Sequence, residues 1–196
     1  MTILKGLLAP FQIFNDVVLP IGRGIAVACI ALMVVCILVQ VFFRYVLNSA
    51  LPWPDEAARF LMLWMTGLIA PSAYRTGGFV AIDMFERALP KTLAAIVSLL
   101  LLAISLIVLV TAAKLGYTET FGFGGKFASS TLWVPLDWVG GTSFKVLLRY
   151  MYMSIFVGFV LLTIVNIELI LRSIITLFGG GDTLKPLSDL DLAGAE

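Results

Sequence analysis

The chain has 196 residues, of which 61% are hydrophobic and only 13% are charged. A soluble domain cannot bury so large an apolar fraction, so the composition predicts an integral membrane protein. The formal net charge is +1, which excludes binding of nucleic acid or of an acidic partner through bulk charge.

The residue types also exclude much chemistry. The chain has no histidine, and its two cysteines, Cys29 and Cys36, lie seven residues apart in one apolar run. This spacing puts both on roughly the same face of one helix, as a packing pair rather than a metal site. We therefore expect no catalytic residues, no bound metal, no cofactor and no enzymatic activity.

The amino-terminal residues 1–21 contain Lys5 and a short apolar run that Asn15 and Asp16 interrupt. No small-residue cleavage site follows cleanly, so the pattern is not that of a secretory signal. We expect a retained segment that lies in the membrane interface.

Four windows without charged residues follow, at 24–43, 60–74, 92–113 and 150–167. A helix needs roughly 20 residues to cross a bilayer. The first and third windows are long enough, the second becomes so if its helix begins near Pro54, and the fourth if it extends past Glu168. We predict an all-α membrane domain over residues 22–173, with helices at 22–46, 54–76, 91–116 and 143–173.

Between the first two windows lies the charged stretch FFRYVLNSALPWPDEAARFL, residues 42–61. Pro54 suits the first position of a helix, and Asp55 and Glu56 then face the positive end of its dipole. Arg59 can pair with either acid on the same face, and Arg44 can approach from the preceding helix.

Two interpretations of this stretch stay open. One is a well-capped helix start at the membrane boundary, with Trp53 in the aromatic belt. The other is a charged lock for subunit assembly, because charges near hydrocarbon are costly unless paired. The residues expected to have this structural or subunit-interface role are Arg44, Asn48, Trp53, Asp55, Glu56 and Arg59.

Two connections carry weaker signals. Residues 75–91 place apolar and charged side chains on opposite stripes, which predicts a short amphipathic helix on the membrane surface. Residues 114–149, rich in glycine and aromatics, are expected to form an ordered interfacial loop. Near its end, Lys145 and Arg149 crowd the positive end of the fourth helix. An acidic partner, lipid phosphates or solvated snorkelling would relieve this crowding, so both are candidate partner-facing residues.

At the far end of the fourth helix, Glu168 precedes Arg172 by four residues, the favourable order for a helical ion pair. We assign this pair a structural role. Residues 174–196 are glycine-rich and acidic, and we expect a flexible tail. No internal repeat is visible, and the basic residues divide seven against six between the two sides, so charge alone does not orient the chain.

The segment RYVLN-x4-W-x-DEAARFLMLWMTGL-x-A, followed by YRTGG and AID, resembles the signature of one transporter family. This is the DctQ-like family, the small membrane subunits of tripartite ATP-independent periplasmic (TRAP) transporters. The resemblance implies four transmembrane helices in the inner membrane of a bacterial or archaeal cell. It implies that both termini lie in the cytoplasm. It also implies a large elevator-type membrane subunit as partner, a periplasmic binding protein that delivers an organic acid, and uptake driven by sodium.

Residue by residue, the resemblance covers nine positions: Arg44, Tyr45, Asn48, Trp53, Glu56, Arg59, Arg75, Gly77 and Asp83. A histidine common in the family before the Ile-Asp pair is replaced here by Phe79-Val80-Ala81. We expect no substrate-binding residues in this chain, because its spans have no cations at their centres. Membrane lipids are further expected partners. The alternatives are an independent small channel or carrier, and an anchor subunit of a membrane enzyme complex.

Overall fold

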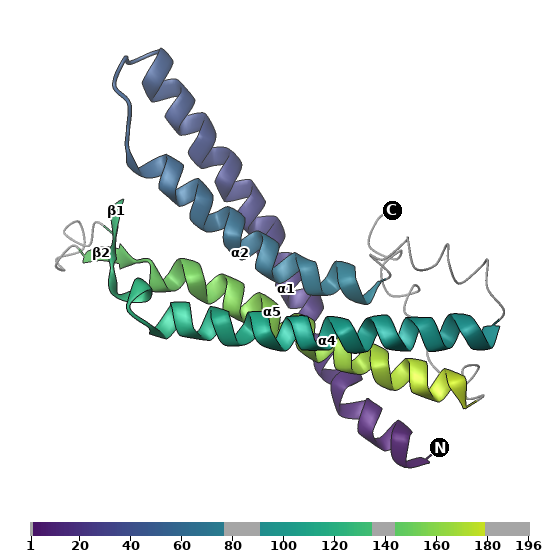
Figure 1. Ribbon diagram of the computed structural model, residues 1–196. Coiled ribbons are helices and arrows are strands. Elements are labelled where there is room, and N and C mark those ends of the chain that lie inside the picture. Colours follow the sequence, from purple (N-terminus) through teal and green to yellow (C-terminus); the bar gives the residue numbers. More distant parts are fainter. Residues whose placement is uncertain (1, 77–90, 135–143, 179–196) are drawn as a thin grey trace, which may run out of the picture. The chain divides into compact units, whose positions relative to one another are not determined.

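The computed structural model describes residues 2–76, 91–134 and 144–178. Four long helices dominate it: α1 (Thr2–Tyr45), α2 (Trp53–Arg75), α4 (Lys91–Phe121) and α5 (Arg149–Leu177). A short 3-10 helix, η1 (Gly124–Lys126), follows α4 and leads into β1 (Ala128–Val134) and β2 (Phe144–Leu147), which pair antiparallel (Figure 1). The predicted helical class is confirmed, with one small hairpin added.

Three of the described helical stretches are long and apolar enough to cross a membrane: Gly6–Tyr45, Ala95–Phe121 and Arg149–Leu177. In α2, charged residues stand near both ends, with Asp55, Glu56 and Arg59 at its start and Arg75 as its last residue. Its start at Trp53 lies one residue from the predicted start. That α2 also crosses the membrane stays a prediction.

Helix α1 begins much earlier than the predicted residue 22 and includes Pro10 and Pro20. An interior proline costs a helix about 3 kcal/mol, because it removes a hydrogen bond and crowds the preceding turn. Tertiary contacts offset this cost, since Leu8, Asn15 and Leu19 are buried along one face of the segment. The interfacial position predicted for residues 1–21, and with it the predicted division of the chain at residues 21 and 173, stays a prediction.

The described residues of the connection expected at 114–149 are more regular than the interfacial loop we expected. Helix α4 continues to Phe121, and α5 begins at Arg149 rather than near residue 143, because residues 144–147 pair with β1. Residues 174–177 of the tail expected at 174–196 belong to α5. The amphipathic surface helix expected at 75–91 falls almost wholly on 77–90, and the rest of the tail on 179–196. Both lie outside the described residues.

Each long helix contributes to two compact units. Unit 1 comprises Met1–Ile21, Ala70–Thr111 and Val160–Glu196, and unit 2 comprises Gly22–Ile69 and Ala112–Phe159. The apolar core of unit 1 is formed by Leu19, Tyr74 and Val165, against which leucines from α4 and α5 pack. Unit 1 also buries several polar and charged side chains beside this core.

In unit 2, α2 and α5 come very close to each other. A Cβ on Gly67 would lie 2.6 Å from the backbone oxygen of Ser154, and a Cβ on Gly158 would lie 2.9 Å from Cα of Gly67. Glycine is therefore required at both positions, because only its lack of a side chain permits this approach. The indole Nε1 of Trp64 donates to the carbonyl oxygen of Tyr150 at 3.1 Å and joins the same two helices.

Candidate functional site

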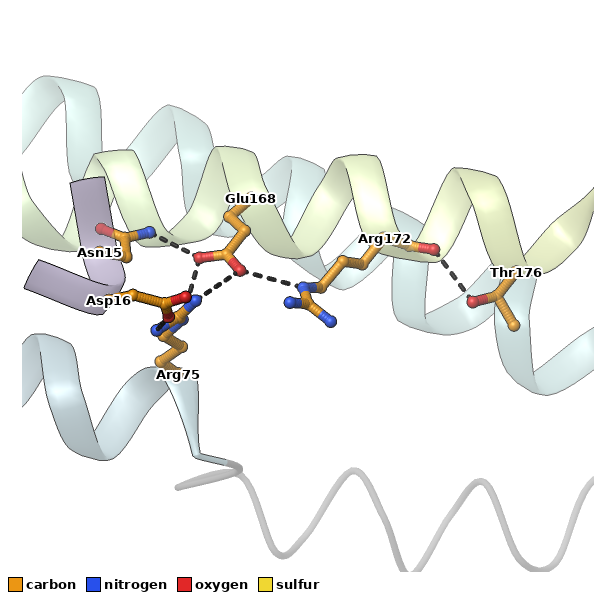
Figure 2. A network of polar contacts seen from close by, with 6 residues as sticks. All are labelled: Asn15, Asp16, Arg75, Glu168, Arg172 and Thr176. Carbon is orange, nitrogen blue, oxygen red and sulfur yellow. Dashed lines mark hydrogen bonds and ion pairs between the residues drawn. The ribbon is translucent and has the colours of Figure 1, made fainter. Parts of the chain in front are cut away.

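Glu168 on α5 lies at the centre of a group of charged side chains in unit 1, and none of its surface is exposed. Arg75, the last residue of α2, binds it with two parallel hydrogen bonds (Figure 2). Its Nε donates to Oε2 at 3.0 Å and its Nη2 donates to Oε1 at 2.9 Å. This two-pronged geometry is among the strongest that a guanidinium and a carboxylate form.

Three further side chains complete the group. Arg172, one turn along α5, donates from Nε to Oε1 of Glu168 at 3.0 Å. From α1, the amide of Asn15 donates to Oε2 at 2.6 Å, and Asp16 accepts a bond from Nη1 of Arg75 at 2.6 Å (Figure 2). We call this group the charge network; its residues are Asn15, Asp16, Arg75, Glu168 and Arg172. It joins α1, α2 and α5.

The charges of the network balance, because two guanidinium groups face two carboxylates. Arg75 is 7% exposed and Arg172 9%, whereas the Asp16 side chain is 36% exposed. A charge removed from water is costly unless it is paired and hydrogen-bonded. Here every buried charge has a partner of opposite sign, so the arrangement suits holding helices together better than binding an external anion.

A second polar contact lies beside the network. The amide of Asn166, which is fully buried on α5, donates to the hydroxyl of Tyr74 on α2 at 2.7 Å. Tyr74 precedes Arg75, and Asn166 precedes Glu168 by two residues, so the same stretches of α2 and α5 are joined twice. Interhelical hydrogen bonds of this kind stabilise helix pairs where water is excluded.

The sequence predicted only part of this site. The pair of Glu168 and Arg172 is confirmed, because its four-residue spacing shows it directly. Arg75 entered only through the family resemblance, and Asn15 and Asp16 were treated as interruptions of an apolar run. Polar residues inside an apolar helix are costly unless they are bonded, and that cost is the signal that could have identified them.

The residues of the charged stretch 42–61 belong to unit 2 and are not members of this network. Most of them are exposed: Arg44, Asn48, Trp53, Asp55 and Arg59. Arg44 stacks over the ring of its neighbour Tyr45, 5.9 Å from the ring centre. Asn48 has a φ of 49°, a left-handed conformation that asparagine tolerates well, in the turn between α1 and α2.

Glu56 does not pair with Arg59 within the described part of the chain. Its carboxylate instead accepts hydrogen bonds from the backbone of β1, at Thr131 and Leu132. The ion pair that Glu56 could form with Arg59 on the same helix face is therefore replaced by a contact with β1, some 75 residues further along the chain. Spacing along one helix does not reveal such a contact.

Of the two basic residues near the start of α5, Lys145 is exposed on β2, and its backbone lies opposite Trp133 in the hairpin. Arg149 is partly buried, with its guanidinium 5.6 Å from the ring centre of Phe121. The Nε of Arg149 has no hydrogen-bond partner among the described residues. Gly77 and Asp83 lie outside them.

The structure thus defines a helical protein with one small hairpin, long apolar helices and a charge-balanced polar interior. A protein-family model, that of the tripartite ATP-independent periplasmic transporters, DctQ component, matches residues 33–176. The chain belongs to this family, and it is therefore an integral membrane component of a TRAP transporter and not an enzyme. The searches of curated proteins and of solved structures gave no match.

Proposed function

We propose that this chain is the scaffold component of its TRAP transporter, which supports a large elevator-type membrane component during uptake. In this proposal sodium drives the uptake of an organic acid, which a periplasmic binding protein delivers. The observation that carries the proposal is the charge network, in which Arg75 and Arg172 are bound to Glu168 of the same chain. Cations engaged in this way hold helices in place and are not available to a carboxylate substrate.

The outer surfaces of the helices support a role beside another membrane protein. In the most apolar 18-residue stretch of each helix, the share that is buried within the chain is only 6% for α4 and 11% for α1, against 33% for α5. Much apolar surface is therefore left for lipid and for a partner. In a membrane, close packing between helices rather than exclusion of water drives such association.

We further propose that α2 is a fourth membrane crossing, which places both termini on one side. The family resemblance assigns that side to the cytoplasm and the membrane to the inner membrane of a bacterial or archaeal cell. The turn at Asn48 and the hairpin then face the periplasm. This orientation puts Lys145 on the side where the binding protein approaches.

The exposed residues of the stretch 42–61 are proposed to contact the large component. Replacing Arg59 by alanine is expected to lower the amount of large component that co-purifies, without lowering the unfolding temperature of this chain, because Arg59 is exposed. Lys114→Ala, which removes an exposed cation from α4, is the matched control. Equal recovery of the large component with both variants would remove Arg59 from the proposed interface.

Reconstitution tests the proposed function. Liposomes are prepared with this chain, with the large component, or with both, and are supplied with the binding protein, the organic acid and an inward sodium gradient. We expect uptake only when both membrane components are present. Uptake by liposomes that contain this chain alone would show an independent carrier and would overturn the scaffold role.

A further inference from the structure

The contact between Glu56 and the hairpin lies in unit 2 and is separate from the charge network. One carboxylate oxygen, Oε2, accepts the backbone N–H of Thr131 at 2.9 Å and that of Leu132 at 3.1 Å. The hydroxyl of Thr131 donates to the same oxygen. Three donors from two adjacent residues of β1 thus meet on this oxygen in the first turn of α2, and the N–H of Leu132 is shared with Oγ of Ser129 at 2.9 Å.

The two strands of the hairpin advance by different numbers of residues, which leaves N–H groups of β1 for an acceptor outside the strand pair. Ala128 lies opposite Leu147 and Trp133 opposite Lys145, so β1 advances five residues where β2 moves back two. The additional residues of β1 leave the ladder, as in a large β-bulge, and their N–H groups lose their strand partners. An N–H group that is shielded from water and unpaired is costly. In this part-buried stretch Glu56 accepts from the N–H of Thr131 and shares the N–H of Leu132 with Oγ of Ser129.

The sequence of α2 leaves Glu56 available for this purpose. The acid that commonly bonds back to the N–H groups of its own helix start is the third residue of the helix, which in α2 is Asp55. Here Pro52 and Pro54 have no N–H group, which leaves fewer donors to satisfy. Asp55, the neighbouring acid, is exposed and still complements the helix dipole.

We propose that Glu56 is a latch that holds the hairpin on the amino end of α2. Within the described part of the chain, the hairpin has two further attachments, which come from its own chain ends. The N–H of Leu148 bonds the carbonyl of Phe127 at 2.9 Å, and η1 connects β1 to α4. Neither attachment reaches α2, so the carboxylate of Glu56 fixes β1 there.

The latch also sets the place of Lys145. Lys145 lies opposite Trp133, which directly follows the irregular part of β1. Release of that irregular part would therefore loosen the pairing of Trp133 with Lys145. Only this consequence for a partner depends on the proposed transport role. The latch itself does not.

Hydrogen exchange of the full chain in lipid nanodiscs tests the proposal, with mass spectrometry of a peptide that covers residues 128–134. Glu56→Gln keeps the shape of the side chain and removes its charge. We expect the exchange of the Thr131 amide to rise by about tenfold or more, because a neutral amide oxygen accepts more weakly than a carboxylate. The Leu132 amide should respond less, because it keeps its bond to Oγ of Ser129. Asp55→Asn makes the same change one residue away and is expected to leave the exchange unaltered.

Exchange of peptides from residues 160–177, in unit 1, reports whether the variant is folded. If these peptides keep their protection while residues 128–134 exchange faster only in the Glu56 variant, the latch is supported. Unchanged exchange at 128–134, or an equal rise with Asp55→Asn, overturns it.

A milder variant serves if Glu56→Gln loses protection throughout. Thr131→Val removes one of the three donors and leaves the backbone in place, whereas Thr131→Ser keeps all three. We expect a rise of a few-fold in exchange with valine and little change with serine. Equal exchange in these two variants would contradict the latch.

Discussion

Among single residues, Glu168 has the greatest structural consequence, because the two guanidinium groups buried in the described part of unit 1 both bind it. Arg75 uses its Nε and both terminal nitrogens, on Glu168 and on Asp16. A lysine could not reproduce this fork of donors, which explains why arginine suits the position.

Glu168→Gln is expected to destabilise the chain by about 3–5 kcal/mol, because two buried arginines would then share the charge of Asp16 alone. The measurement is the free energy of unfolding in detergent micelles. Glu119→Gln, at an exposed glutamate of α4, is the control and should change it by less than about 0.5 kcal/mol. Equal effects of the two substitutions would show that the network does not stabilise the fold.

The distances along the chain explain which contacts the sequence could predict. Arg172 follows Glu168 by four residues, within one helix, so helical geometry alone predicts their pairing. Arg75 and Asn15 lie 93 and 153 residues from Glu168 and reach it only through the packing of three helices. The sequence carries no local signal for such pairs.

At the scale of the elements, close packing of α2 on α5 determines unit 2. Gly67→Ala would place a Cβ 2.6 Å from a backbone oxygen of Ser154, an atom that cannot move without moving α5. Overpacking of this kind costs about 1–3 kcal/mol. The expected result is a lower unfolding free energy.

Gly24→Ala in α1 is the matched control, since a Cβ there meets nothing within 4 Å. Alanine is the better helix former by about 1 kcal/mol, so this variant should be as stable as the original chain or more so. Equal loss of stability in both variants would indicate a general intolerance of helix substitution and not a close contact at Gly67.

Local signals located some element boundaries and missed others. The start of α2 followed from Pro54 and its acidic neighbours, which act through the backbone of the same turn. The early start of α1 did not follow, because Pro10 and Pro20 argue against a helix until the buried contacts of Asn15 and Leu19 are known. The hairpin was missed because β2 has only four residues and β1 is irregular, so the alternation that marks a strand is weak.

At the scale of the whole molecule, the proposed orientation requires an even number of crossings. A reporter fused after Ser49, in the turn after α1, should report the periplasm, and one fused after Leu187 should report the cytoplasm. Alkaline phosphatase and green fluorescent protein give complementary signals for the two sides. If both fusions report the same side, the scheme of four crossings is wrong; if their signals are exchanged, the orientation is inverted.

The family match places the chain in a tripartite transporter, and the central claim is that it acts there as a scaffold for a larger membrane component. Affinity purification of the tagged chain from its native membrane in mild detergent tests this claim most directly. We expect a larger membrane protein to co-purify in nearly equal amount and to remain bound through size-exclusion chromatography. Recovery of this chain alone, stable and active in transport, would contradict the account.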